Sequence, residues 1–226
     1  MKRNVGKHLW MGPGLLLAFT LWTVLILSVD VREAGPNETE IGLAALNLWF
    51  HRLTGVHLTL YAITDWLGLV PIAVCMGFGV LGLIQLVRRK SLRRVDPDVV
   101  CLGIYYILVI LCYLLFEAVP INYRPILIGG RLEASYPSST TLLVLSVMPT
   151  LKLQAGRRSN RAAIRKTAGG FALGFSSFMV VGRMVSGVHW ISDIVGAVLL
   201  SLGLFFLYRD SVEALDRREE KKHGIQ

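Results

Sequence analysis

The residue types best suited to chemistry lie in one stretch near the C-terminal end, from Gly182 to Asp193. Arg183, His189 and Asp193 occur there within or beside strongly apolar sequence, where ionisable side chains are unfavourable and usually functional. His189 and Asp193 are four residues apart, so they share one face if the stretch is helical. A carboxylate in that place can accept a hydrogen bond from one imidazole nitrogen and leave the other free to attack. The stretch therefore predicts an activated histidine beside a cation.

A second polar group lies upstream, between two apolar runs. Arg124 precedes a proline, and residues 137–140 read Pro-Ser-Ser-Thr at the start of the next run. Serine and threonine there are typical of a helix N-terminus, whose free backbone amides favour an anion. The parallel N–H donors of an arginine guanidinium match the geometry of phosphate oxygens. We therefore expect Arg124, Arg183, Ser138 and Ser139 to bind a phosphate, if the fold brings them to one place.

Six apolar runs must position these residues. Apolar residues make up 54% of the 226-residue chain and charged residues only 17%, whereas a soluble domain has about 25% charged residues. The runs cover residues 13–29, 66–87, 99–116, 138–151, 167–188 and 190–208. Run 138–151 is short for a bilayer, which needs about 20 residues, but it can cross if its polar start lines a wet cavity. We predict an all-α membrane bundle of six transmembrane helices.

The segments between the runs complete this architecture. The first run resembles a signal peptide, but no small-residue cleavage site follows it, so we expect an uncleaved span. Segment 41–64 contains His51 and His57 and is too polar to span, so it is expected to form extracytoplasmic interfacial helices. Residues 1–226 then form one membrane domain, with 1–65 as first span and interfacial segment, 66–208 as five-span core and 209–226 as cytoplasmic tail. Glycines at 77, 79, 82, 170 and 174 are expected to allow close helix packing.

Basic residues fix the predicted orientation. With a cytoplasmic N-terminus, segments 1–12, 88–97, 152–166 and 209–226 are cytoplasmic and hold 19 of the 24 Lys and Arg residues. The positive-inside rule predicts this bias, so both termini are expected in the cytoplasm and the phosphate site outside it. Because topology accounts for the net charge of +9, the bilayer is the expected partner and nucleic acid is not. A short single-domain chain suits a bacterial plasma membrane, and the sequence is silent on oligomeric state.

Placed this way, the residues resemble the type 2 phosphatidic acid phosphatases, the membrane relatives of the vanadium haloperoxidases. That family carries, in order, the motifs Lys-x6-Arg-Pro, Pro-Ser-Gly-His and Ser-Arg-x5-His-x3-Asp. Arg183, His189 and Asp193 match the third motif at its full spacing. Arg124 with its following proline matches the first, and Ser138 with its preceding proline matches the second. The resemblance covers about residues 66–208.

The resemblance implies a role for each matched residue. His189 would be the nucleophile that forms a phosphohistidine, and Asp193 would orient it. Arg124 and Arg183 would bind the phosphoryl oxygens, and Ser138 with nearby amides would complete the site. Such a site satisfies phosphoryl transfer, which needs charge stabilisation and an in-line nucleophile. The resemblance thus implies a membrane lipid phosphate or diphosphate phosphatase, with no metal or other cofactor.

Three positions depart from the family pattern. Glu117 stands in place of the first motif's lysine, Gly182 in place of the third motif's serine, and Thr140 in place of the second motif's histidine. By resemblance that histidine protonates the leaving group, and losing a general acid typically lowers the rate ~10²–10⁴-fold.

Three explanations of the missing acid remain open. The substrate can have a good leaving group, such as the phosphate of a lipid diphosphate. A substitute can supply the proton, with Thr140, Glu117, His51 and His57 as candidates. Alternatively, the chain is a catalytically impaired relative that binds lipid phosphates without turnover. A transporter is disfavoured because the sequence has no paired discontinuous helices in matching halves.

Overall fold

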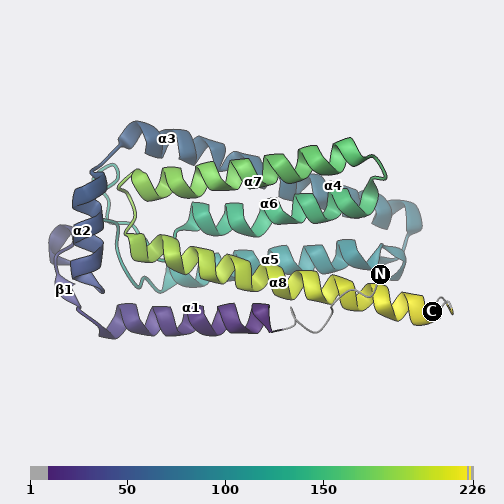
Figure 1. Ribbon diagram of the computed structural model, residues 1–226, viewed down its shortest axis with the longest axis horizontal. Helices are drawn as coiled ribbons and strands as arrows, with labels where there is room; N and C mark the ends of the chain where they lie inside the picture. The colour runs from purple at the N-terminus through teal and green to yellow at the C-terminus, as the bar shows by residue number, and fades with distance from the viewer. Residues whose placement is uncertain (1–9, 223, 225–226) are drawn as a thin grey trace.

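The computed structural model describes residues 10–222 and 224, and this part of the chain is mainly helical (Figure 1). Its helices are α1 (Met11–Ser28), α2 (Ala44–Thr54), α3 (Leu58–Leu67), α4 (Leu69–Arg89), α5 (Pro97–Ala118), α6 (Ser139–Arg158), α7 (Ala162–Val185) and α8 (Ile191–Lys222). Two 3₁₀ turns, Pro36–Glu38 and Leu92–Arg94, and an antiparallel pair of two-residue strands, β1 (Arg32–Glu33) and β2 (Glu40–Ile41), lie between helices. The predicted all-α class is confirmed.

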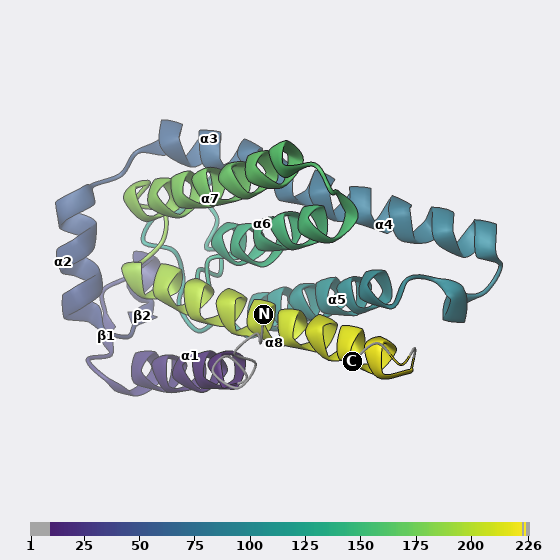
Figure 2. The same ribbon diagram turned by 45° about the vertical axis from the view of Figure 1, so that its right-hand side comes forward.

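Most of the helices run along one bundle axis, and α2 crosses one end of the bundle (Figures 1 and 2). The start of α8 and the end of α7 lie at that end, which we call the site end. The α4–α5 and α6–α7 connections lie at the other end, which we call the opposite end. Asn47 of α2 is buried and exchanges hydrogen bonds with Ser192 at the start of α8, at 2.9 and 3.2 Å. This pair fixes α2 across the bundle.

Five helical segments of the described residues are long and apolar enough to cross a membrane: 11–28, 58–89, 97–118, 162–185 and 191–221. The chain is therefore an integral membrane protein. Helix α6 does not meet the same criterion, so a sixth crossing stays a prediction. Its polar residues explain the difference, because they are buried inside the protein and face partners there.

Helix α6 occupies the middle of the bundle, in contact with α4, α5, α7 and α8 (Figure 1). Its Thr150 and Gln154 are buried, and each is hydrogen bonded to a tyrosine of a neighbouring helix, Tyr106 at 2.6 Å and Tyr208 at 2.7 Å. Buried polar groups are stable only when paired in this way. A helix surrounded by protein does not need a lipid-compatible surface, which is why its apolar run is short.

Helix α3 differs from the predicted interfacial segment. It runs along α7 and leads almost directly into α4, so residues 58–89 form one apolar segment rather than a span that begins at residue 66. The break at Gly68 has a local cause, since Pro71 lacks an amide hydrogen and its ring disfavours a regular helix four residues back. Gly182 of α7 lets α3 approach closely: a Cβ there would lie 2.7 Å from the Thr64 methyl carbon.

The glycine predictions for α4 and α7 are mostly wrong. A Cβ built at Gly77, Gly79, Gly170 or Gly174 would meet no atom within 4 Å, and only Gly82 faces a neighbour, Val99 at 3.2 Å. Close packing occurs instead between α1 and α8, where a Cβ on Gly203 would come 2.8 Å from Leu16.

Candidate active site

His189 lies in the short connection between α7 and α8, with its side chain only 1% exposed. Its Nδ1 lies 3.1 Å from the Ser135 hydroxyl, which in turn donates a hydrogen bond to Asp193 Oδ2. Asp193 also accepts the backbone amide of Trp190 at 2.9 Å. His189 Nδ1 and Asp193 Oδ2 are 3.8 Å apart, too far for a direct hydrogen bond. The carboxylate therefore orients the imidazole through Ser135, whereas the sequence predicted direct contact.

Burial lowers the pKa of His189 to about 4, since a buried imidazole is hard to charge. The neighbouring Asp193 opposes this shift, while the positive charges of Arg124 and Arg183 add to it. At neutral pH the ring is uncharged. A neutral imidazole has a lone pair available for attack, which a nucleophile requires.

Arg183 comes from the last turn of α7 and is 1% exposed. Its Nη2 forms an ion pair with Asp65 Oδ1 of α3 at 2.9 Å and also donates to the Thr140 hydroxyl. Its guanidinium carbon lies 4.9 Å from the centre of the Tyr61 ring. One edge of the guanidinium is thus fixed by α3 and α6.

Arg124 comes from the loop between α5 and α6. Its Nε lies 3.1 Å from Glu133, and its guanidinium carbon is 5.8 Å from the same Tyr61 ring. The loop is held over the start of α8, because Trp190 donates from its indole nitrogen to the Tyr123 carbonyl at 2.7 Å. Cation–ring contacts on one tyrosine bring the two arginines near each other.

Several atoms of these side chains are buried without a hydrogen-bond partner among the described residues. They are Arg124 Nη1, Arg183 Nε and Nη1, and His189 Nε2. Buried polar groups are normally satisfied, and unpaired cationic donors are especially unfavourable. An anion between the two guanidinium groups would satisfy these donors, so the site has the chemistry of a phosphate-binding pocket.

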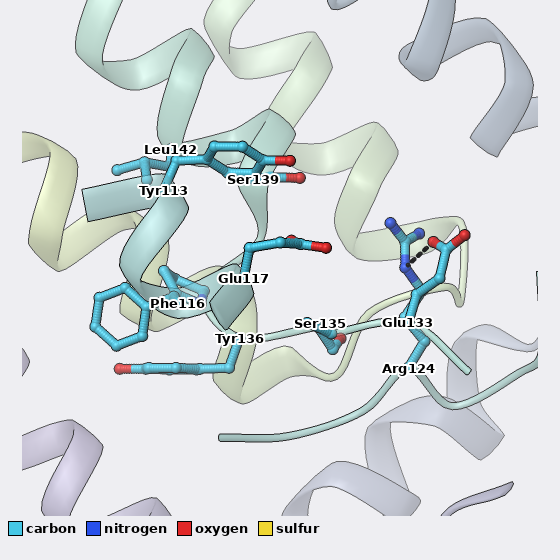
Figure 3. A pocket seen from close by; sticks show the side chains of 11 residues that line it. Tyr113, Phe116, Glu117, Arg124, Glu133, Ser135, Tyr136, Ser139 and Leu142 are labelled. Carbon is cyan, nitrogen blue, oxygen red and sulfur yellow. Dashed lines mark ion pairs between the residues drawn. The ribbon is translucent and has the colours of Figure 1, made fainter. Parts of the chain in front are cut away.

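A cavity of about 220 Å³ lies beside these residues. Figure 3 shows Glu117 and Arg124 entering it from different elements, α5 and the α5–α6 loop. Ser135 and Ser139 also line it. Ser138 does not: its hydroxyl donates to Thr141 at 3.1 Å, and its amide donates to the Asp193 carbonyl at 3.2 Å. Ser138 thus holds α6 against α8, which differs from the phosphate contact predicted for it.

Among the predicted proton donors, Glu117 alone lines this cavity. His51 Nε2 lies 3.2 Å from the Gly187 carbonyl, and its ring packs on Trp190. His57 Nε2 lies 2.8 Å from the Thr54 carbonyl. Thr140 accepts the hydrogen bond from Arg183.

Residues 108–216 match the sequence model described as the PAP2 superfamily. The match covers just under half of the chain. No curated protein matches the chain. The fold resembles the crystal structure of the first transmembrane PAP2-type phosphatidylglycerolphosphate phosphatase from Bacillus subtilis, with a TM-score of 0.59 and 17% sequence identity over 91% of this chain and 98% of that one.

The PAP2 segment contains Arg124, Ser135, Arg183, His189 and Asp193, and α3 lies outside it. The sequence did not indicate three further residues of the site: Tyr61, Asp65 and Ser135. Asp65 offered a signal, because it is a carboxylate at the edge of an apolar run, a position where ionisable side chains are usually functional. Ser135 offered none, since a loop serine has no distinctive spacing.

Proposed function

We propose that the chain is a membrane phosphatase that removes a phosphate from a lipid phosphate or diphosphate through a phosphohistidine. One observation carries this proposal. Two buried arginines have donors without partners among the residues that the structure describes, beside a neutral histidine whose Nε2 likewise has none there. The match of residues 108–216 to the PAP2 superfamily and the resemblance in fold to a phosphatidylglycerolphosphate phosphatase support the same reaction class.

The proposed reaction has two displacements. His189 Nε2 attacks the terminal phosphorus, a nitrogen–phosphorus bond forms, and the bond from phosphorus to the leaving oxygen breaks. Arg124 and Arg183 stabilise the charge on the equatorial oxygens. Water then attacks the phosphohistidine, inorganic phosphate leaves, and the imidazole recovers its lone pair.

We propose Glu117 as the proton donor to the leaving oxygen, because it lines the cavity and the other candidates do not. Glu117→Gln is expected to lower kcat ~10²-fold on a lipid monophosphate, whose alkoxide leaves poorly without a proton. On a lipid diphosphate the loss should be small, since a phosphate leaves readily. Thr140→His is the companion variant: a gain on monophosphates would indicate that the native site lacks an efficient acid.

A second candidate function, binding of lipid phosphates without turnover, is favoured by one observation. Thr140 occupies the motif histidine's position, and its hydroxyl is already engaged by Arg183. Assay of the purified protein separates the two functions. Wild type should release phosphate from phosphatidic acid or a polyprenyl diphosphate, His189→Ala should not, and Arg165→Ala at the opposite end should match wild type. No release by wild type from either class would leave the binding function.

We propose that both termini lie in the cytoplasm and that the site end lies outside it. This orientation places 19 of the 24 Lys and Arg residues on the cytoplasmic side, as the positive-inside rule requires. Cysteine variants tested with a membrane-impermeant thiol reagent in intact cells check this orientation. A cysteine at residue 131, beside the site, should be labelled, and one at residue 165 should not. The reverse pattern contradicts the proposal.

A further inference from the structure

A pocket of about 560 Å³ lies at the opposite end of the bundle, away from the phosphate site. Its walls are the start of α5 and the C-terminal part of α8, and the 3₁₀ turn Leu92–Arg94 completes it. The two helices run side by side (Figures 1 and 2), and the rings of Tyr105 and Tyr208 stack with their centres 4.8 Å apart. Because the helices are antiparallel, this contact places residues 97–104 beside residues 211–218. We call this space the α5–α8 pocket.

The lining of the α5–α8 pocket combines an apolar wall with positive charge at one end. The wall consists mainly of aliphatic side chains from both helices and the turn before α5: Leu92, Val95, Val100, Ile104, Ala214 and Leu215. From Pro97 to Ile104 it extends about 10 Å along α5 towards the membrane interior. Of the described residues that line the pocket, only Arg93 and Arg218 are charged, and both lie at the outer end of the wall. The pocket therefore has a cationic rim and an apolar interior.

The two rim arginines differ from other arginines at this end of the bundle. Asp98 of α5 is paired with Arg157 at 3.3 Å and with Arg158 at 2.9 Å. The side chains of Arg93 and Arg218, in contrast, are exposed and have no ion pair or hydrogen bond with any residue that the structure describes. Their charge is not used inside the fold, so it is available to an anion at the membrane surface.

We propose that the α5–α8 pocket binds an anionic phospholipid, with the phosphate at Arg93 and Arg218 and one acyl chain along the apolar wall. Basic pockets between transmembrane helices are suited to anionic headgroups. This lipid is not a substrate in place for reaction, because the length of α8 from Ile191 to Arg218 separates it from the phosphate site by about 40 Å. The inference is independent of the proposed phosphatase reaction.

The apolar wall distinguishes a phospholipid from a free anion. Water solvates both exposed arginines, and salt screens charges in such positions, so the two guanidinium groups alone attract an anion only weakly. An acyl chain packed between α5 and α8 would keep its own phosphate at the rim. We therefore expect a phospholipid to bind here and inorganic phosphate not to bind.

Titration of the purified whole chain with lipid in a nonionic detergent tests the proposal. The probes are phosphatidylglycerol, which is anionic, and phosphatidylcholine with the same acyl chains, which has no net charge. Both are phosphodiesters, so a phosphatase that removes a terminal phosphate consumes neither. The measurement is the lipid concentration that gives half of the rise in the thermal unfolding midpoint. Wild type should respond to phosphatidylglycerol at a lower concentration than to phosphatidylcholine.

The rim is tested by removing one charge at a time. Arg93→Gln and Arg218→Gln should each raise the half-effect concentration of phosphatidylglycerol about fivefold, since one arginine near a membrane surface contributes about 1 kcal/mol. Arg88→Gln is the matched control. Arg88 is an exposed arginine at the same end and does not line the pocket, so its loss changes the net charge equally and should leave the half-effect concentration unchanged.

The apolar wall is tested by filling it while both arginines stay in place. Ser211 lines the pocket from α8, and its hydroxyl donates only to the Leu207 carbonyl of the same helix, at 2.8 Å. Ser211→Trp should raise the half-effect concentration of phosphatidylglycerol at least as much as the loss of one arginine. Arg183→Ala, which alters the phosphate site, should respond to phosphatidylglycerol as wild type does.

Four results would overturn the proposal. They are no response of wild type to phosphatidylglycerol, an equal response to phosphatidylcholine, the same loss in Arg88→Gln as in the rim variants, and a response that Arg183→Ala abolishes while Arg93→Gln and Arg218→Gln keep it. The last result would place the bound lipid at the phosphate site instead.

Discussion

The two ends of the bundle use their arginines in opposite ways. At the opposite end, Arg157 forms a bidentate pair with Asp216 at 2.7 Å and also contacts Asp98 at 3.3 Å. Arg158 pairs with the same Asp98 at 2.9 Å. At the site end, Arg183 uses one nitrogen for Asp65 and leaves two without partners among the described residues. An arginine with satisfied donors stabilises a fold, whereas one with free donors is prepared for a ligand.

The strongest test of this contrast exchanges one arginine from each end for alanine. Arg183→Ala should lower kcat/KM about 10²–10³-fold, because it removes charge that acts on the transition state. Its thermal stability should change little, since Asp65 is 57% exposed and water can solvate it. Arg157→Ala should leave kcat/KM per folded molecule unchanged and lower the free energy of unfolding by about 1–2 kcal/mol.

Measurement of kcat/KM and of the thermal unfolding midpoint on the same preparations separates the two effects. A loss of stability without loss of activity in Arg183→Ala would refute the assignment of the site end to ligand binding.

Inorganic phosphate should stabilise the protein through the site end only. At a concentration 100 times its Kd, a ligand that binds only the folded state adds about 2.7 kcal/mol. We expect this increase in wild type and in Arg157→Ala, and its loss in Arg124→Ala and Arg183→Ala. Thermal unfolding in detergent at rising phosphate concentration measures it. Equal stabilisation in all four proteins would mean that the anion binds elsewhere.

The pH dependence should follow His189, whose pKa of about 4 lies below the ordinary 6.5. The attacking ring must be neutral, so with a lipid diphosphate, whose leaving group needs no proton from Glu117, kcat/KM should stay level from pH 7 to about 5 and fall near pH 4. Between these pKa values the unfolded state binds more protons than the folded state, so His189 lowers stability as the pH falls through this window. In His189→Gln, the part of the pH dependence of the free energy of unfolding that comes from this imidazole should disappear. An acid limb of kcat/KM near pH 6.5 would contradict a buried neutral ring.

Ser135 should give the smallest of these effects. Ser135→Ala removes the hydroxyl between His189 and Asp193, and the carboxylate then orients the ring less well. We expect kcat to fall about fivefold to tenfold with KM nearly unchanged, less than the ~10²–10⁴-fold typical of a group that itself transfers the proton, because Ser135 only orients the ring. Ser139→Ala, which alters the lining of the cavity but not this relay, is the comparison. A larger loss in Ser139→Ala would place the important hydroxyl at the start of α6.

The parts of the site that the sequence indicated are those fixed by local spacing. His189, Asp193 and Arg183 lie within eleven residues of one another, so their spacing is visible in one short stretch of sequence. Asp65 reaches Arg183 across 118 residues of sequence, and Ser135 reaches Asp193 across 58. Contacts of that range depend on how α3 and the α5–α6 loop pack, which no local pattern records.

The fold was predictable to the same extent. Long uninterrupted apolar runs gave the helices, because a lipid-facing helix must be apolar along its length. Gly77 and Gly79 of α4 were misread, since a glycine that packs against a neighbour and one that faces open space look alike in sequence. Residues 58–64 of the predicted interfacial segment were misread as well: Tyr61, together with the following Asp65, faces Arg183 rather than a membrane surface.

The burial of α6 has a consequence for how the protein is made. Thr150 and Gln154 gain their tyrosine partners only once α5 and α8 are beside them, and α8 emerges from the ribosome after α6. Until then α6 is poorly suited to stay alone in hydrocarbon. Its stable residence in the bilayer therefore depends on completion of the last helix, so truncation before α8 should leave a chain that cellular quality control removes.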